Sequence, residues 1–200
     1  MSGTGQTIFL RRKTATGLLF EPSEQCISVL EAKFKAKPVT LRNVAIGDYS
    51  GFVSFCEEED CGEGSSVRET HDKYSGTVRK ISLVTLDEEL LDSAINVDFL
   101  KIDTEGYDLR VLKGAETLLR VGRIRFIQFE YNAHWLGVGS SLAEARCFLE
   151  NFGFQLLLIR SSGLHPLNYA FWGDYFRYSN FLAYSREDKH LINCILSDKM

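Results

Sequence analysis

Short apolar runs alternate along the chain with longer segments in which apolar residues recur at helical spacing. The first run, 18–20, ends at the acidic Glu21, which is the pattern of a buried strand that stops at a turn. Ser23 can accept a hydrogen bond from the start of a helix, and apolar residues at helical spacing follow until Pro38. The pattern therefore predicts a strand followed by a helix.

The same alternation continues toward the C-terminus. Further strands are predicted over 39–46, 52–55, 78–86, 97–103, 124–130, 152–159 and 179–185. Helices are predicted over 86–93, 107–120 and 142–149, the last opened by a capping box of Ser141 and Glu144. Strands that alternate with helices predict an α/β fold, with a doubly wound, mostly parallel sheet covered on both faces.

Three of the predicted strands end in an acidic residue: Glu21, Asp103 and Glu130. In an open α/β sheet, ligands bind beyond the carboxyl ends of the strands. These acids are therefore expected to line one edge of the sheet, where they would form a site. Glu21 has two open interpretations, because an acid at this place can bind the ribose hydroxyls of a cofactor or can interact with the dipole of the next helix.

Asp103 is the sharper candidate of the acids around the turn after its strand. Lys101 lies on the same side of the strand, where it can pair with an acid, orient a substrate or remain solvated. Glu105 and Asp108 are interpreted as acids in the first turn of the following helix.

The segment after Glu130 adds Asn132 and His134. Asp103, Glu130 and Asn132 form an oxygen-rich set that would suit Mg²⁺. Alternatively, Glu130 and Asn132 are hydrogen-bonded loop residues that organise His134 and Trp135. His134 is a candidate general base, with a structural role as the alternative.

Two loops carry unusual composition. Residues 56–76 form a predicted acidic surface loop, for which a lid function is an alternative. The loop before the last strand is rich in aromatic residues, which can wall a substrate pocket or cover the sheet edge. These residues are Tyr169, Phe171, Trp172, Tyr175, Phe176 and Tyr178.

Composition narrows the class of protein. The chain of 200 residues is 44% hydrophobic and 25% charged, which fits one folded domain over 1–200 with a tail over 186–200. The net charge of −4 argues against a nucleic-acid partner, and no apolar run approaches the roughly 20 residues of a membrane helix. Five cysteines at irregular spacing predict reduced thiols, and the N-terminus does not have the pattern of a signal peptide, so a cytoplasmic location is expected.

One segment, L-K-I-D-T-E-G-Y-D-L-R-V-L-K-G-A-E-T-L-L at 100–119, resembles the core of the FkbM-type methyltransferases. That family typically has a strand, K-I-D-x-E-G, and a helix with V-L-x-G-A. Four other segments resemble the family in the same order, and the resemblance covers about 17–185. They are 20–25 (F-E-P-S-E-Q), 43–51, 84–90 and 126–135.

The resemblance implies a class I, Rossmann-like fold that uses S-adenosylmethionine, generally to O-methylate a sugar or another small-molecule hydroxyl. It implies that Glu21 holds the ribose hydroxyls and that the stretch Ala45, Ile46, Gly47 and Asp48 borders the adenine. Asp103 would lie near the methionine end of the cofactor and the reacting oxygen. Asp103, Glu130 and His134 are then the candidates for taking the proton of the acceptor.

The chain departs from the family at its N-terminus. The family starts this domain with a strand and a D-x-G-A-N-x-G-like loop that binds the methionine portion of the cofactor. Here Gly3 and Gly5 are the possible counterparts, and the acidic residue and the first strand have none. Either the chain is truncated or residues before Glu21 take over this part, because a missing central strand would leave two strand edges open.

Two other functions stay open. A non-catalytic remnant of the fold would act as a binding module and would not bind the cofactor. A metal-dependent hydrolase would use Asp103, Glu105 and Glu130 and would respond to a cation alone.

Overall fold

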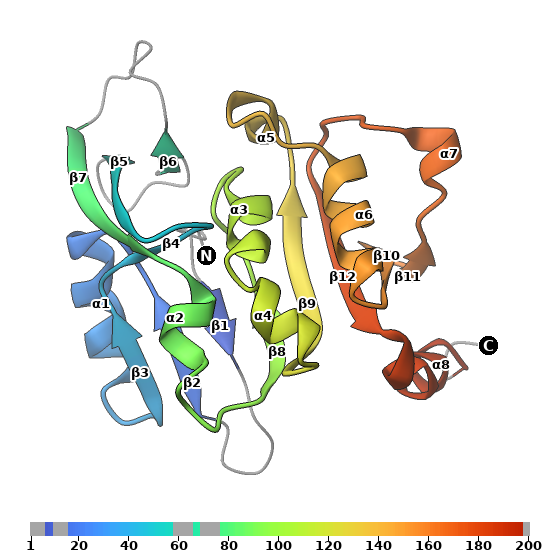
Figure 1. Ribbon diagram of the computed structural model, residues 1–200, viewed down its shortest axis with the longest axis horizontal. Coiled ribbons are helices and arrows are strands. Elements are labelled where there is room, and N and C mark those ends of the chain that lie inside the picture. Colours follow the sequence, from blue (N-terminus) through green and yellow to red (C-terminus); the bar gives the residue numbers. More distant parts are fainter. Residues whose placement is uncertain (1–6, 10–15, 58–65, 69–76, 198–200) are drawn as a thin grey trace.

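The computed structural model describes residues 7–9, 16–57, 66–68 and 77–197. Its larger sheet has eight strands in the order β11-β10-β12-β9-β8-β1-β2-β3 (Figure 1). These strands are β1 (Thr7–Phe9), β2 (Gly17–Phe20), β3 (Val39–Arg42), β8 (Val97–Lys101), β9 (Ile124–Tyr131), β10 (Phe154–Arg160), β11 (Gly163–Pro166) and β12 (Ser179–Ser185).

The sheet is mixed. Strands β2, β3, β8, β9 and β10 run in one direction, and β1, β12 and β11 run against them. Only the pairs β2–β3 and β8–β9 are parallel neighbours within this described sheet. A mostly parallel sheet was expected. Most strands do run in one direction, but most neighbouring pairs are antiparallel, because reversed strands lie between the others.

Strand β1 lies inside the sheet, between β8 and β2. It pairs antiparallel with β2 on one side, where Thr7 lies opposite Phe20, and with β8 on the other, where Ile8 lies opposite Lys101. Residues before Glu21 thus occupy the place of the first strand, which was one of the two expected alternatives, and they do so with a strand of three residues that runs in the reverse direction. Covering the edges of β2 and β8 matters because unpaired strand edges recruit other chains.

A second sheet lies beside the first, with the order β4-β7-β5-β6. Its strands are β4 (Ala45–Ile46), β5 (Gly51–Glu57), β6 (Ser66–Arg68) and β7 (Thr77–Val84). The single strand predicted over 39–46 is divided between the two sheets. At the division, the Asn43 amide donates hydrogen bonds to the carbonyl oxygens of Glu21 and Pro22, at 2.8 and 3.2 Å, and this bends the chain away from β3.

The predicted acidic loop over 56–76 is also shorter than expected. Strand β5 extends to Glu57, and β6 pairs with β5 inside the range that was predicted to be loop. The rest of the range lies outside the described residues, so the lid function stays a prediction.

The helices follow the predicted order. They are α1 (Glu24–Phe34), α2 (Leu86–Leu90), α3 (Asp108–Lys113), α4 (Glu116–Arg120), α5 (His134–Gly137), α6 (Leu142–Asn151), α7 (Tyr169–Trp172) and α8 (Lys189–Ser197). The predicted N-caps of α1 and α6 are confirmed, since Ser23 accepts from the Cys26 N–H and Ser141 accepts from the Glu144 N–H. These bonds satisfy backbone donors that have no partner inside the helix. Only the Ser141 half of the predicted capping box is present, because the Glu144 carboxylate pairs with Lys113.

The single helix predicted over 107–120 is two helices that separate at Gly114. A Cβ atom at Gly114 would lie 1.8 Å from the carbonyl oxygen of Gly47, so the backbones can approach only because this residue has no side chain. The Asp87 carboxylate then caps α4 by accepting from the N–H groups of Thr117 and Leu118, at 2.8 and 2.9 Å.

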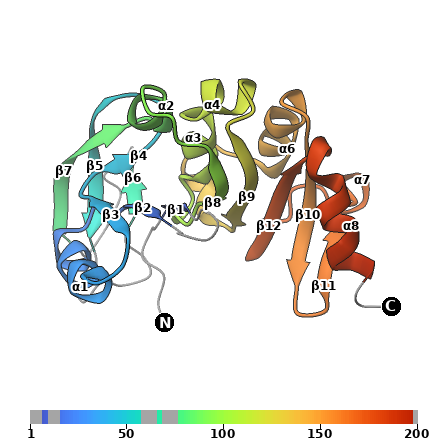
Figure 2. The same cartoon turned by 90° about the horizontal axis from the view of Figure 1, so that it is seen from below.

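The main core lies between the larger sheet and helices α3, α4 and α6, which Figure 2 shows on one side of the sheet. It includes Leu100 of β8, Ile127 of β9 and Phe181 of β12, all fully buried. On the opposite face, Ile192 of α8 packs against Leu157 of β10 and neighbouring residues. The alternation of strand side chains between the two faces accounts for both cores.

Within the described residues, no helix has the length and apolar character needed to cross a bilayer. Cys26 and Cys56 are buried and Cys147 is exposed. The expectation of reduced cysteines stays a prediction.

Candidate functional site

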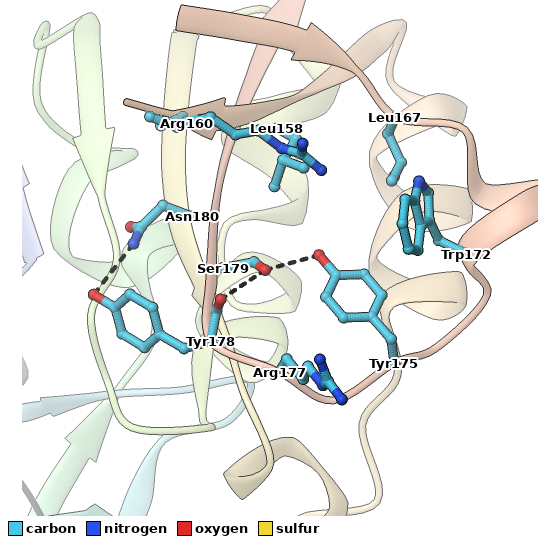
Figure 3. A pocket seen from close by; sticks show the side chains of 10 residues that line it. Leu158, Arg160, Leu167, Trp172, Tyr175, Arg177, Tyr178, Ser179 and Asn180 are labelled. Carbon is cyan, nitrogen blue, oxygen red and sulfur yellow. Dashed lines mark hydrogen bonds between the residues drawn. The ribbon is translucent and has the colours of Figure 1, made fainter. Parts of the chain in front are cut away.

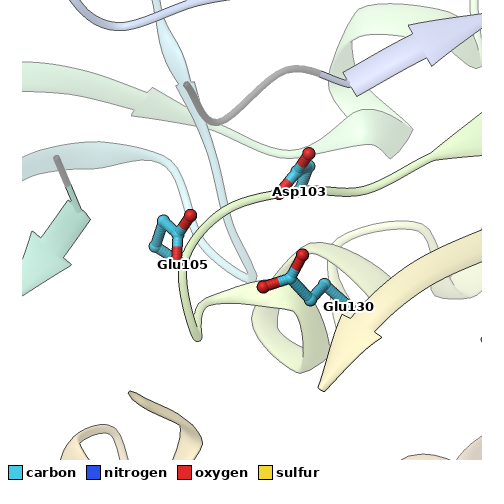
Figure 4. A group of neighbouring side chains, drawn as sticks. All are labelled: Asp103, Glu105 and Glu130. Carbon is cyan, nitrogen blue, oxygen red and sulfur yellow. The ribbon is translucent and has the colours of Figure 1, made fainter. Parts of the chain in front are cut away.

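The candidate site lies at the carboxyl edge of the central strands. There, carboxylate oxygens of Asp103, Glu105 and Glu130 all lie within 4.8 Å of one another (Figure 4). Asp103 follows β8, and Glu130 lies in β9, which pairs with β8 so that Lys101 is opposite Gln128. The parallel register therefore brings together two of the strand-end acids, as predicted from the sequence.

This edge is also where the order of the strands reverses. The chain passes from β2 outward to β3 on one side and from β8 outward to β9 on the other, with β1 between them. Glu21 follows β2 and Asp103 follows β8, so the two acids stand on either side of the reversal. Such a switch point is the usual ligand site of an open α/β sheet.

The sequence leaves Glu105 with two roles, a first-turn helix acid or a member of the hydrolase set with Asp103 and Glu130, and the structure brings it next to these two acids. Its φ of 50° and the φ of 105° at Gly106 turn the chain sharply before α3 begins. A Cβ atom at Gly106 would lie 2.8 Å from the Cβ of His134, so this turn is pressed against α5. The T-E-G segment signalled a tight turn, but not that the turn would aim Glu105 at the other acids.

Glu105 also contacts His134. Its Oε2 lies 3.2 Å from the His134 Nδ1, and the side chains are 11% and 54% exposed, respectively. Burial raises the pKa of Glu105 to about 8, with further contributions from the negative charges of Glu130, Asp103 and Asp108. A carboxyl group with this pKa is mostly protonated at neutral pH and can exchange a proton with the imidazole.

Asp108 lies beneath the cluster and is fully buried. It accepts hydrogen bonds from the Thr104 hydroxyl at 2.9 Å and from the Glu130 N–H at 3.1 Å. Burial raises the pKa of Asp108 to about 7, although these hydrogen bonds oppose the shift. As predicted, it stands in the first turn of a helix, but its bonds also join the start of α3 to the end of β9.

Asn132 organises the segment that follows β9. Its amide donates to Glu130 Oε1 at 2.8 Å, and its Oδ1 accepts from the His134 N–H at 2.9 Å. The Trp135 Nε1–H donates to the Glu130 carbonyl oxygen at 2.9 Å. These bonds match the alternative in which Glu130 and Asn132 position His134 and Trp135. The Asn132 oxygen that was proposed as a Mg²⁺ ligand already accepts a backbone hydrogen bond. The third group that converges with Asp103 and Glu130 is the carboxylate of Glu105, in place of Asn132.

The remaining charges of the cluster are partly compensated. Lys101 Nζ lies 2.5 Å from Asp103 Oδ2, which is one of the pairings expected from their spacing along the strand. Burial raises the pKa of Glu130, while hydrogen bonds from Asn132 and Tyr178 lower it. Among the residues that the structure describes, Lys101 thus compensates part of the negative charge of the cluster, and burial favours protonation of some of the carboxyl groups.

The residues predicted to hold a cofactor occupy the neighbouring part of the edge. Glu21 is 1% exposed, and its Oε1 accepts from the Ser23 N–H at 2.9 Å. Ala45 and Ile46 are buried in β4, and Asp48 forms an ion pair with Arg110 at 2.7 Å.

The turn that follows β4 lies against the turn that carries Glu105. A Cβ atom at Gly47 would lie 3.0 Å from the ring of Tyr107, so the predicted adenine segment contacts the residue that directly follows the T-E-G turn. Gly3 and Gly5 lie outside the described residues, and their predicted role stays a prediction.

A pocket of about 680 Å³ opens beside this edge, between β10, β12 and the segment around α7 (Figure 3). Trp172, Tyr175 and Tyr178 from the aromatic loop line it. Tyr169 and Phe176 from the same loop pack against the core instead. The loop thus contributes both to the wall of a pocket and to packing against the core, with Tyr175 in both places, and part of it forms β11. That this pocket binds a substrate stays a prediction.

Comparison with known proteins identifies a family that the chain matches. Residues 5–156 match the model of the family described as "Methyltransferase FkbM domain". No curated protein matches the chain. Among solved structures, the chain is similar to the methyltransferase FkbM from Methylobacillus flagellatus KT, with 14% identity and a TM-score of 0.45. The match covers 82% of this chain and 36% of the other, so the chain spans about a third of the length of that protein.

Proposed function

Because this chain belongs to the FkbM methyltransferase domain family, we propose that it transfers a methyl group from S-adenosylmethionine to a hydroxyl oxygen of a small molecule, such as a sugar. The observation that carries the proposal is the convergence of Asp103, Glu105 and Glu130 at the carboxyl edge of the sheet, beside a pocket of small-molecule size. The reversal of strand order at this edge supports a Rossmann-like arrangement of the site.

The residues at the edge fit the cofactor. When bound, S-adenosylmethionine supplies an electrophilic methyl group. Glu21 would hold the ribose, because a carboxylate at the end of β2 can accept hydrogen bonds from two hydroxyls. Ala45 and Ile46 would border the adenine, since the turn after them lies beside Tyr107. Gly3 and Gly5 remain the proposed contacts of the methionine portion.

His134 is the proposed proton acceptor of the reaction, and Glu105 is the residue that positions its imidazole. Methylation of a hydroxyl releases a proton, and the half-exposed imidazole of His134 is placed to take it. When Glu105 is ionised it accepts from the His134 Nδ1–H, which leaves Nε2 with a free lone pair. Asp103 and Glu130 would orient the acceptor hydroxyl, with Lys101 compensating part of their charge.

Calorimetric titration with S-adenosylhomocysteine tests the proposal. We expect micromolar binding by the full chain and weakening by at least about tenfold in Glu21→Gln, because charged acceptors bind hydroxyls more strongly than neutral ones. Glu24→Gln is the matched control, because Glu24 is exposed and lies only three residues away in α1. A thermal unfolding transition for each variant establishes that it is folded.

The same titration separates the other functions. A chain that unfolds cooperatively but does not bind S-adenosylhomocysteine would contradict the methyltransferase proposal and favour a non-catalytic binding module. Stabilisation by Mg²⁺ with no effect of S-adenosylhomocysteine would favour a metal-dependent hydrolase based on Asp103, Glu105 and Glu130.

A further inference from the structure

The pocket beside the acid cluster combines aromatic walls with two cationic side chains. Leu158, Leu167, Trp172 and Tyr175 provide apolar and aromatic surface, and the Trp172 and Tyr175 ring centroids are 6.4 Å apart. A volume of about 680 Å³ is that of a typical small-molecule pocket. The walls therefore suit a compound with a flat or ring-shaped body.

Arg160 and Arg177 provide the positive charge. Both line the pocket, and Figure 3 draws them on opposite sides of Tyr175, Arg160 from β10 and Arg177 from the segment that leads into β12. Within the described ranges, neither guanidinium forms an ion pair with an acidic residue, although most other arginines there do or bind backbone carbonyls. A guanidinium binds carboxylates and phosphates in bidentate fashion, so two of them without acidic partners favour an anionic ligand.

The pocket also shares a wall with the acid cluster. Tyr178 lines the pocket, and its hydroxyl lies close enough to the Glu130 carboxylate to lower the pKa of that group. Asn180 donates to the same hydroxyl at 3.3 Å, and it lies opposite Glu130 in the β9–β12 ladder. A ligand bound between the arginines and Tyr178 would therefore extend from a cationic end toward the acids.

From these contacts we propose that the pocket is the acceptor site and that the acceptor is a hydroxylated ring compound bearing a carboxylate or phosphate group. The inference rests on the proposed methyltransferase function. The anionic group would bind Arg160 and Arg177, the ring would lie against Trp172 and Tyr175, and the hydroxyl would point toward Tyr178 and Glu130.

The test compares 4-hydroxybenzoate with 4-hydroxybenzamide, which have nearly the same shape but differ in charge. Calorimetry on the full chain is expected to give a preference of at least about tenfold for the acid, as ion pairing to arginine predicts. Arg160→Gln and Arg177→Gln should each reduce this preference without weakening amide binding. Arg186→Gln is the control, because Arg186 is exposed and does not line the pocket.

Phenyl phosphate distinguishes the two anions, because tighter binding than 4-hydroxybenzoate would identify phosphate as the group recognised and would support the inference. The inference would be overturned if 4-hydroxybenzoate and 4-hydroxybenzamide bound with equal affinity and phenyl phosphate bound no more tightly. It would also be overturned if the preference for 4-hydroxybenzoate persisted in both arginine variants.

S-adenosylhomocysteine binding is measured separately on the same samples. If it is retained while the preference is absent, only the acceptor assignment fails. If the preference is present but S-adenosylhomocysteine does not bind, the methyltransferase function fails and the acceptor role is overturned with it.

Discussion

The Glu105 carboxylate lies 3.2 Å from the Nδ1 of His134, although the two residues come from different elements. Gly106 allows this approach, because any side chain there would collide with His134. The contact places the carboxyl group of a mostly buried acid beside a half-exposed imidazole. When Glu105 is ionised, it can accept the Nδ1–H of His134, which leaves Nε2 as the acceptor nitrogen.

We expect methyl transfer to depend on this pair. His134→Gln should lower kcat/KM by about 10²- to 10⁴-fold, the usual effect of removing a general base. In the unsubstituted protein, kcat/KM should rise with pH through about 8, because ionised Glu105 accepts the Nδ1 proton and frees Nε2. Glu105→Gln should remove this rise. The rate of S-adenosylhomocysteine release, measured between pH 6 and about 9.5, tests this expectation. Glu116→Gln on α4 is the control. A pH profile that is unchanged in Glu105→Gln would contradict the assignment.

Stability should also depend on pH through the buried acids. The pKa of Glu105 is raised to about 8 and that of Asp108 to about 7, from 4.5 and 3.8. Between the unfolded and the folded pKa of each acid, the folded chain binds more protons than the unfolded chain. The free energy of unfolding should therefore fall as pH rises from about 5 to about 8. Urea denaturation at both pH values measures this fall.

Single substitutions identify the groups responsible for the fall. Glu105→Gln and Asp108→Asn should each make the free energy of unfolding less dependent on pH, because neither amide titrates. Glu144→Gln, at an exposed position of α6 next to Lys113, should leave the dependence as it is. A free energy of unfolding that rises with pH over this range would contradict the direction of both shifts.

The contact between Gly114 and Gly47 predicts a strong effect of a single methyl group. Gly114→Ala should destabilise the fold by about 1–3 kcal/mol or more, because the added Cβ would meet a backbone oxygen that cannot move freely. Gly137→Ala is the matched control, since a Cβ atom there has nothing within 4 Å. The free energy of unfolding from urea denaturation measures both. Equal stability of the two variants would show that the backbones can separate without cost.

The Asp87 carboxylate should contribute about as much to the free energy of unfolding as a typical helix cap. Asp87→Ala removes the acceptor for two N–H groups at the start of α4 and should cost about 0.5–2 kcal/mol. Asp87→Asn retains one acceptor oxygen and should cost less. Asp92→Ala, at an exposed position shortly after α2, should change the free energy of unfolding little. If Asp87→Ala had no larger effect than Asp92→Ala, α4 would not depend on this cap.

Features that depend on local sequence could be predicted. The caps at Ser23 and Ser141 follow from residues within one helical turn, and the acids Asp103 and Glu130 follow from strands whose ends are marked by polarity. Their convergence required only that the two strands be parallel neighbours, which β8 and β9 are.

Features that depend on contacts between distant parts of the chain could not be predicted from the sequence. The break at Gly114 arises from contact with Gly47, which the helical periodicity of 107–120 does not contain. Likewise, the division of 39–46 depends on the hydrogen bonds of Asn43 to the end of β2, and the position of Glu105 depends on a positive φ at a residue that is not glycine. Local propensity is overridden at each of these positions by tertiary structure.

The placement of β1 has a consequence for the order of folding. Ile8 pairs with Leu19, a near neighbour in sequence, and also with Lys101, which lies half the chain away. Pairings with large sequence separation raise the contact order and form slowly, because the intervening chain must first be closed into a loop. The β1–β2 hairpin can therefore assemble early, whereas its docking on β8, which unites the two sides of the ligand edge, belongs to a late step of folding.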